Sequence, residues 1–134
     1  MNTNLITCPC GSNKTYPTCC GRYLDGNEIA ATVEALMRSR CTAYTLLRED
    51  YLLAIWHLST RPAALDLAND VPTKWIGLEL KRHEQQDAEH AIAEFVARYK
   101  VNGRAHRLHE FSRFVREAGR WFYVDGDIER GQGP

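Results

Sequence analysis

Several features that would assign this sequence to a broad class are missing from it. No run of residues approaches the ~18 consecutive apolar positions that a membrane-spanning helix requires. The first seven residues contain neither a basic region nor an apolar segment of signal-peptide length. The formal net charge is zero, so no overall field draws the protein to nucleic acid or to a membrane. We therefore expect a cytoplasmic protein with no membrane partner.

The composition is that of an ordinary globular protein. Of the 134 residues, 44% are hydrophobic and 25% are charged, which excludes a chain that is disordered throughout. No internal repeat is visible. This length suits one domain of moderate size together with a small appendage.

Cysteine is scarce except in one short segment. Four of the five cysteines lie in "CPCGSNKTYPTCCG", residues 8–21, with the spacing C-x-C-x8-C-C. Cytoplasmic thiols stay reduced, so clustered cysteines indicate a metal site more than disulfides. The alternatives are an unmetallated thiol cluster or two disulfides, although a bridge between adjacent cysteines would be strained. A redox role is disfavoured because C-x-x-C is absent.

Two close pairs of thiolates can supply the four soft ligands of a tetrahedral zinc ion. The predicted metal ligands are Cys8, Cys10, Cys19 and Cys20. Four thiolates on a divalent ion leave two excess negative charges, which Lys14 and Arg22 are placed to offset. Because protein atoms fill all four positions, we expect a structural site without catalysis at the metal.

The segment resembles the SEC-C motif, a short zinc-binding tail also found on the bacterial preprotein translocase ATPase. The resemblance rests on Cys-Pro-Cys-Gly-Ser, a lysine, a tyrosine and a terminal ligand pair. It implies zinc as the cofactor, with iron as the alternative metal, and contact with a protein partner or the ribosome. It implies no catalytic activity. We assign residues 1–24 to this motif.

The rest of the chain changes from helical to strand-like periodicity at Pro72. Apolar residues recur at helical spacing over 28–47 and 49–57, and a cap at 59–62 predicts a short third helix that ends near Ala68. The predicted strands cover 76–80, 91–99, 104–117 and 120–125. The fold class is therefore α+β, with three N-terminal helices packed on a curved antiparallel sheet.

Four further segments carry a second resemblance. They are "LMRSRCTAY" at 36–44, "YLLAIWH" at 51–57, "EFVARY" at 94–99 and "HEFSRFVREAGRWFYVDG" at 109–126. With the cysteine motif they resemble the YchJ-like family of bacterial proteins, which joins a SEC-C motif to a cone-shaped domain similar to nuclear transport factor two. Cys41 stands where we expect an aromatic residue. The resemblance implies this fold for 25–128, followed by a flexible tail at 129–134.

Hairpin turns give an independent prediction of the sheet register. Asn102-Gly103 is a strong two-residue turn signal, and it places Phe95 opposite Glu110. A second turn at Ala118-Gly119 places Phe114 opposite Tyr123. One face of the sheet should then carry five large apolar side chains with two polar ones among them, namely Phe95, Leu108, Phe114, Trp121, Tyr123, Glu110 and Ser112.

A matching basic residue lies in the apolar stripe of the first predicted helix. Arg40 must be paired or reach water there, and Glu110 is suited to a two-pronged hydrogen bond with it. This pair is either a structural ion pair or the polar floor of a small-molecule pocket. The pocket candidates are Arg40, Trp56, His57, His109, Glu110, Ser112 and Trp121.

Two further functions remain open at this stage. An alternative function is an enzyme site in the cone for an unknown small molecule, for which Asp50 and His57 would join Glu110, although nothing in their spacing requires it. The opposite face of the sheet should carry Arg98, Lys100, Arg107 and Arg113. This set either contacts RNA or is neutralised by the acidic residues at 79–94, which include Glu79. A binding or adaptor protein, docked through the zinc motif, is the favoured interpretation.

Overall fold

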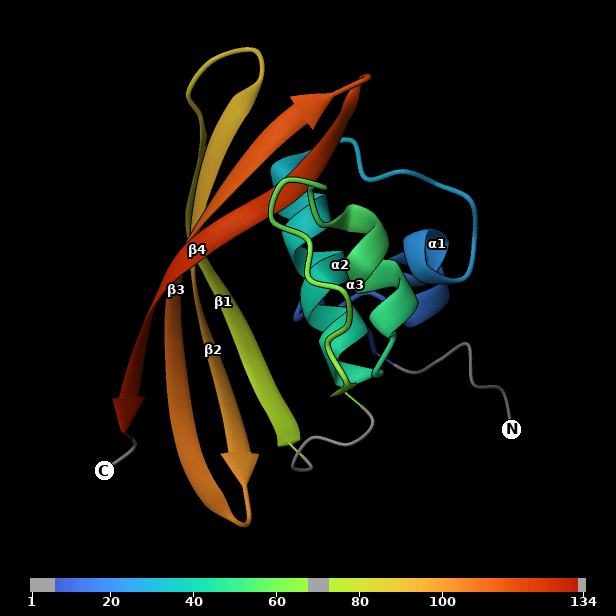
Figure 1. The fold of residues 1–134 in the computed structure, drawn as a ribbon. Helices are drawn as coiled ribbons and strands as arrows, with labels where there is room; N and C mark the ends of the chain where they lie inside the picture. The colour runs from blue at the N-terminus through green and yellow to red at the C-terminus, as the bar shows by residue number, and fades with distance from the viewer. Residues whose placement is uncertain (1–6, 68–72, 133–134) are drawn as a thin grey trace.

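The structure, a computed structural model, describes residues 7–67 and 73–132, with only the backbone described for 129–132. Its largest element is a four-stranded antiparallel sheet in the order β1-β2-β3-β4. The strands are β1 Thr73–Gln85, β2 His90–Val101, β3 Arg104–Glu117 and β4 Arg120–Gln132. The sheet is strongly twisted, and the helices cover one of its faces (Figure 1).

Both predicted hairpin turns are present. Asn102 and Gly103 have φ angles of 53° and 78°, and Ala118 and Gly119 have φ angles of 52° and 80°. Positive φ at both central residues is the type I′ geometry, whose twist matches that of the flanking strands. These turns set the pairing of β2 with β3 and of β3 with β4.

The predicted register is confirmed. Phe95 lies opposite Glu110, and Ala93 lies opposite Ser112. Phe114 lies opposite Tyr123, directly before an irregularity that shifts the later pairs of β3 and β4 by one residue. The inner face of the sheet therefore carries the mixture of aromatic and polar side chains that the sequence predicts.

The described residues form three α-helices, of which two match the predicted ones. They are α1 Gly21–Leu24, α2 Val33–Thr45 and α3 Glu49–Ile55. Helix α2 begins five residues later than predicted, because the Thr32 side chain accepts a hydrogen bond from the Ala35 amide and caps it there. Ile29, predicted to belong to the helix, is instead 57% exposed.

The third predicted helix is wrong over the described residues 59–67, which form turns and irregular structure; residue 68 lies outside the described part. The Glu49 carboxylate accepts hydrogen bonds from the backbone amides of Leu65 and Leu67. Asp66, between them, has a φ of 58°. A distant side chain thus binds the amides that would have joined a helix.

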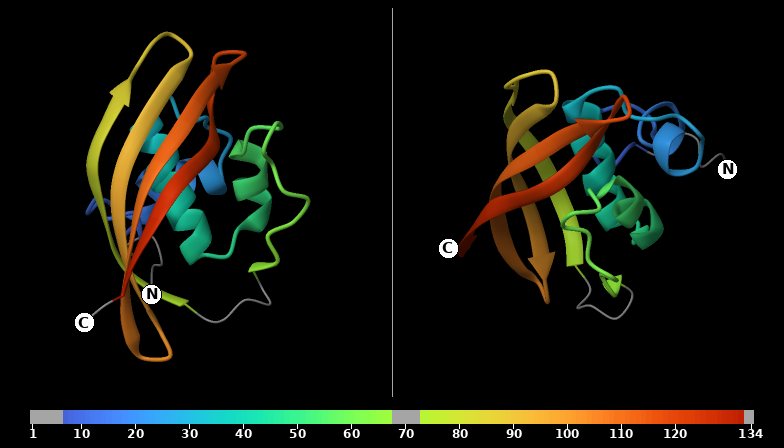
Figure 2. Two further views of the ribbon diagram at one scale, coloured as in Figure 1. Left: turned by 60° about the vertical axis from the view of Figure 1, so that its left-hand side comes forward. Right: turned by 45° about the horizontal axis from the view of Figure 1, so that its top comes forward.

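Helix α2 lies between two apolar clusters. Its Val33, Leu36 and Met37 pack on the small and aromatic residues of the inner sheet face. Ala43 belongs to a second cluster that contains the four N-terminal cysteines and Leu52 of α3. Helix α1 therefore lies on the far side of α2 from the sheet (Figure 2), while the loop before it reaches the edge strand β1 at Gly11.

Strand β4 is longer than predicted. It continues to Gln132, which pairs with His106 of β3, so the flexible tail predicted for 129–134 is a strand up to residue 132. Residues 133 and 134 lie outside the described part. No helix within the described ranges has the length and apolar character needed to cross a membrane.

Candidate functional site

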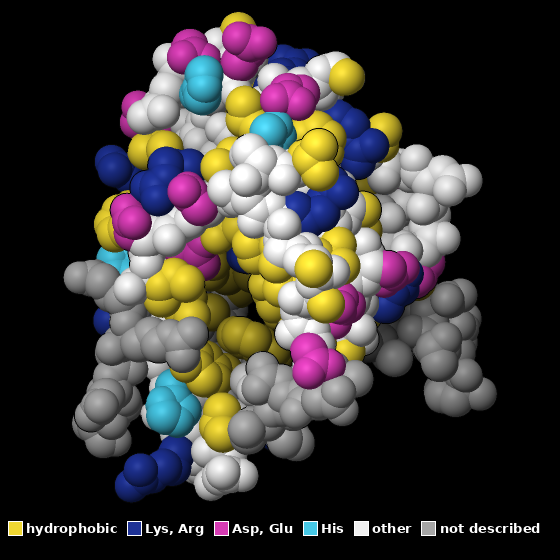
Figure 3. All heavy atoms as spheres, viewed as in Figure 1, with side chains coloured by type: hydrophobic (Ala, Val, Ile, Leu, Met, Phe, Trp, Pro, Cys, Tyr) yellow, Lys and Arg dark blue, Asp and Glu magenta, His cyan; other side chains and the backbone are white. Residues whose placement is uncertain are grey.

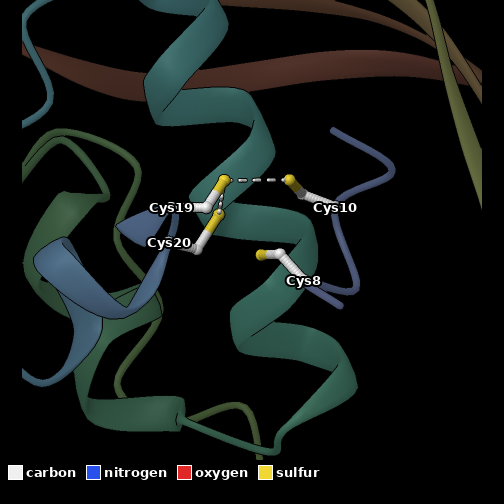
Figure 4. A group of neighbouring side chains, drawn as sticks. All are labelled: Cys8, Cys10, Cys19 and Cys20. Atoms are coloured by element: carbon white, nitrogen blue, oxygen red, sulfur yellow. Dashed lines mark hydrogen bonds between the residues drawn. The ribbon is translucent and has the colours of Figure 1, made fainter. Parts of the chain in front are cut away.

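The four N-terminal cysteines converge on one point. Their sulfur atoms all lie within 4.8 Å of one another, and all four side chains are buried. The Sγ atoms of Cys10 and Cys19 are 3.5 Å apart, and those of Cys19 and Cys20 are 4.0 Å apart (Figure 4). None of the cysteines forms a disulfide, so the disulfide alternative does not hold here.

This spacing fits a tetrahedral metal ion. Zinc–thiolate bonds of about 2.3 Å place the sulfurs of a regular tetrahedron about 3.8 Å apart. The two sulfur–sulfur distances of 3.5 and 4.0 Å lie on either side of that value. A zinc ion held by all four sulfurs would have no vacant position for substrate or water, so the chemistry it would supply is structural.

Local backbone geometry brings the two cysteine pairs together. The Cys8 amide donates to the Lys14 carbonyl over 2.8 Å, which closes the loop that carries the first pair. Gly11 and Asn13 have φ angles of 84° and 69° in this loop. A Cβ atom at Gly11 would lie 3.2 Å from the carbonyl oxygen of Leu78 in β1, so the loop approaches the sheet edge closely.

The thiols share protons unequally. Hydrogen bonds from Cys20 and Cys8 hold the pKa of Cys10 far below its usual range. The pKa of Cys20 is raised well above its usual value, because its thiol is hydrogen-bonded to Cys10. The Ser12 hydroxyl lies 3.1 Å from the Cys19 sulfur and supplies a further donor. The hydrogen bonds of the cluster thus favour a thiolate at Cys10.

Two arginines approach this cluster. Arg22 donates from Nε to the Cys19 carbonyl over 3.1 Å and also pairs with Glu28 at 3.5 Å, whereas the Lys14 side chain is exposed. Arg38 of α2 donates from Nη1 to the Cys10 carbonyl over 2.8 Å. Sequence analysis missed Arg38, because nothing in the sequence indicates a contact across 28 positions.

The predicted hydrogen bond between Arg40 and Glu110 is not formed. Both side chains are buried, with 6% and 3% exposure, but Tyr123 joins them. Its ring centroid lies 3.8 Å from Cζ of Arg40, and its hydroxyl donates to Oε2 of Glu110 over 2.9 Å. Ser112 donates to the same oxygen over 2.8 Å. The tyrosine therefore satisfies the carboxylate and stacks on the cation.

Arg40 lies among aromatic rings. Its Cζ is 5.1 Å from the Tyr44 ring centroid and 5.5 Å from that of Trp56, and the Trp56 ring meets Tyr123 edge-on. Among the described residues, Tyr44 provides the hydrogen bond of Nη2, at 3.4 Å, and Nε is buried without any partner. Trp121 is buried in the core on the same face.

The two histidine candidates lie away from this cluster. His109 is on the outer face of the sheet and contacts Glu94 over 2.7 Å, because strand alternation separates it from its neighbour Glu110. His57 contacts Glu117 over 2.6 Å through Nε2 and Ser59 over 2.7 Å through Nδ1. Including them with Arg40 in one pocket was therefore wrong.

The candidate enzyme arrangement is not assembled by these residues. Asp50 is paired with Arg48, and His57 has the partners given above. Glu110 binds Ser112 and Tyr123. Asp50, His57 and Glu110 thus have separate partners, and together they form no acid–base set.

A row of aromatic rings continues the inner face toward one end of the sheet. Tyr44 contacts Trp75, Trp75 contacts Tyr99, and Tyr99 stacks on His106, at centroid distances of 6.5, 5.2 and 5.2 Å. Figure 3 shows a hollow between the sheet and the helices with a largely hydrophobic wall. The sequence analysis missed this row, although the hairpin register places Tyr99 opposite His106.

The basic outer face is partly neutralised. Arg113 pairs with Asp125 and Asp127 at 2.6 and 3.0 Å, and Arg98 pairs with Glu79 at 3.7 Å. Glu79 was predicted as a neutralising residue, whereas the two β4 aspartates were not. These pairs reduce the charge available for phosphate contacts.

Family models match both parts of the chain. A model described as the middle, NTF2-like domain of YchJ matches residues 32–126, and the SEC-C motif model matches residues 7–22. A UPF0225 protein of Cupriavidus metallidurans is 58% identical over 132 residues, covering 94% of this chain and 92% of its own. A UPF0225 protein of Chromobacterium violaceum is 58% identical over 124 residues, covering 89% and 90%.

Two solved structures have the same architecture. The solution structure of a SEC-C motif containing protein from Rhodopseudomonas palustris has a TM-score of 0.80 at 33% identity, covering 91% of this chain and 98% of its own. The crystal structure of a SEC-C motif containing protein from Psychrobacter arcticus has a TM-score of 0.78 at 28% identity, covering 99% and 88%. The second similarity covers nearly the whole chain and so includes both the cysteine segment and the sheet domain.

Proposed function

The chain belongs to the YchJ family, in which a SEC-C motif precedes an NTF2-like domain, and we propose that it is a zinc-binding adaptor protein. The zinc-loaded segment docks a protein or ribosomal partner, and the sheet domain is a scaffold with a small-ligand pocket. The observation that carries the proposal is the buried group of four cysteine sulfurs, all within 4.8 Å of one another. Such a closed donor set supports a structural ion and a binding role.

Zinc is the proposed metal because four thiolates in a tetrahedral arrangement are a typical zinc site, and iron is the alternative. Elemental analysis of freshly purified protein should find one zinc per chain. Cys20→Ser should lower this content at least tenfold. Cys41→Ser, which removes the cysteine outside the cluster, should leave it unchanged. Metal-free protein whose four clustered thiols all react freely with a thiol reagent would contradict the proposal.

Docking on the ribosome is the proposed use of the loaded segment. The outward side of this segment exposes Asn13, Lys14, Pro17 and Thr18 and carries no acidic side chain between Thr7 and Tyr23. Lys14 is an exposed cation on this surface, so it is the residue through which the segment would contact a phosphate of ribosomal RNA.

Co-sedimentation with ribosomes tests this docking. The zinc-loaded protein should sediment with ribosomes, and Lys14→Glu should reduce the bound fraction. Lys81→Glu makes the same charge change on exposed strand β1 and should have no effect. Equal sedimentation of the two variants would refute docking through the cysteine segment, and absence of the wild-type protein from the pellet would refute the ribosome as partner.

A small-ligand pocket in the sheet domain is the second proposed function. It is supported by the hollow in Figure 3 and by the buried guanidinium of Arg40, whose Nε lacks a partner. A buried cation that is neither paired nor fully hydrogen-bonded is costly, which favours a ligand beside it. An enzyme acting in this cavity is the weaker alternative, since no acid–base set accompanies Arg40 among the residues that sequence analysis selected.

A further inference from the structure

The Arg40 guanidinium uses little of its hydrogen-bonding capacity. It has five N–H donors, yet its hydrogen bond within the described part of the chain is the 3.4 Å contact of Nη2 with the Tyr44 hydroxyl. Three aromatic rings surround it and accept no conventional hydrogen bond. The site therefore offers donors to an incoming oxygen atom.

Glu110 offers the complementary group. Its Oε2 accepts from both Ser112 and Tyr123, whereas the described side chains supply no donor to Oε1. Tyr123 holds Arg40 by its ring and Glu110 by its hydroxyl, so the donor and the acceptor lie within the reach of one tyrosine side chain. A polar ligand group that contacts both Arg40 and Glu110 must carry a hydrogen-bond acceptor and a donor side by side.

The charges of Arg40 and Glu110 determine which of these polar groups binds best. Arg40 and Glu110 cancel each other, so an anion or a cation between them would leave one buried charge uncompensated. A neutral carboxamide avoids this cost, because its carbonyl oxygen accepts from a guanidinium and its N–H donates to a carboxylate. The electrostatics of the site therefore favour an amide over a carboxylate or an amine.

The surroundings suit a flat apolar group. Ile128 lies opposite Glu110 on the inner face and is still 47% exposed, so this part of the face is open. The row of rings begins at Tyr44, beside Arg40, and continues through Trp75 and Tyr99. Aromatic walls of this kind favour a planar ligand, which stacks on them with little strain.

We propose that this cavity binds a neutral carboxamide carried on a flat apolar body, with the amide oxygen on Arg40 and the amide N–H on Glu110. The inference rests on the proposed pocket function and is independent of the metal and of ribosome docking. It specifies the ligand class of that pocket.

An NMR titration of the full-length, zinc-loaded protein tests the proposal with three probes of equal size: benzamide, benzoate and benzylamine. Benzamide should shift the indole signals of Trp56 and Trp75 saturably and bind about tenfold more tightly than either ion, the scale of one charge-assisted hydrogen bond. Glu110→Gln gives the site a net positive charge and should reverse the order, so that benzoate binds best. Asp127→Asn removes one carboxylate from the outer face and should change none of the affinities.

The order of the three probe affinities is measured on the wild-type protein, so this part of the test does not depend on the folding of any variant. Tighter binding of benzoate or benzylamine would overturn the amide assignment and leave the pocket standing. No saturable shift with any probe, in protein that is folded and zinc-loaded, would overturn both the pocket and the amide assignment. Shifts confined to the groove lined by Lys74, Lys100 and Asn102 would overturn the assignment of the site to Arg40.

Discussion

Adding a single methyl group at Gly126 should destabilise the protein through Glu110. Gly126 lies opposite Ser112 on the inner face. A Cβ atom there would lie 2.9 Å from Cδ and 3.0 Å from Cγ of Glu110, and nearer still to Oε2. The carboxylate resists displacement, because it is buried and its Oε2 is held by the hydroxyls of Ser112 and Tyr123.

The magnitude follows from three contributions to Gly126→Ala. Overpacking a buried site costs about 1–3 kcal/mol. Weakening one hydrogen bond to the Glu110 carboxylate costs about 1.5–3 kcal/mol. Alanine also restricts the unfolded backbone more than glycine does, which stabilises the folded protein by about 0.4–1 kcal/mol. Together these give a net loss of about 1.5–5.5 kcal/mol in the free energy of unfolding, which lowers the Tm by about 5–20 °C for a chain of this length.

Urea denaturation of the zinc-loaded protein measures this loss. Gly77→Ala is the matched control, since a Cβ atom there meets nothing within 4 Å, and it should change stability by less than about 0.5 kcal/mol. In the Glu110→Ala variant, Gly126→Ala should change the free energy of unfolding little. The double-mutant cycle of the two substitutions should therefore show strong coupling. An unchanged unfolding curve for Gly126→Ala, or an equal loss in both backgrounds, would refute the reasoning.

Three further predictions concern other parts of the chain. Burial raises the pKa of Cys41 to about 12, so iodoacetamide at pH 8 should alkylate it roughly a thousandfold more slowly in the folded protein than in guanidinium, as mass spectrometry would show. Arg38→Met removes the hydrogen bond to the Cys10 carbonyl and should lower the free energy of unfolding in urea by about 1–3 kcal/mol, with zinc content unchanged. A hydrogen bond from Tyr16 lowers the pKa of Asp25 below 3.8, so the stability advantage over Asp25→Asn should be present above about pH 4 and disappear as the pH falls through the folded-state value.

The sheet was predictable because its determinants are local. A two-residue turn at Asn102-Gly103 fixes which residues face each other, and the two-residue period of a strand then assigns every side chain to a face. The same counting continues through Ala118-Gly119 as far as Phe114 and Tyr123. The counting fails one residue later, where an irregularity beside Arg113 shifts the register. Nothing in the sequence indicates that shift.

The helices were less predictable because distant groups compete for their backbone. Thr32 caps α2 five residues after its predicted start. Glu49 binds two amides of the segment predicted as a third helix. Propensity and a proline near 59–62 favour a helix there, but a carboxylate 16 positions away offers the same amides another acceptor.

The cysteine cluster and the Arg40–Glu110 region also differ in how well the sequence predicts them. The cysteine cluster was foreseeable, since its four ligands lie within thirteen consecutive residues and their chemistry leaves few alternatives. The charges of Arg40 and Glu110 indicated that the two would be buried near each other, but not that Tyr123 would separate them. Opposite charges predict attraction, whereas the shape of the interior decides whether the two groups touch.

Helix α2 explains why an arginine lies in an apolar stripe at all. Met37 and Arg40 point toward the sheet, while Thr42 lies 3.6 Å from the Cys8 sulfur on the opposite side. A helix buried on two sides has no broad solvent-facing side for its polar residues, so each of them needs a partner inside. Thr42 has a cysteine, and Arg40 has three rings and an unfilled donor. The boundary between residues 24 and 25 therefore divides two sequence motifs, whereas the cysteine cluster and the inner face of the sheet both pack on helix α2.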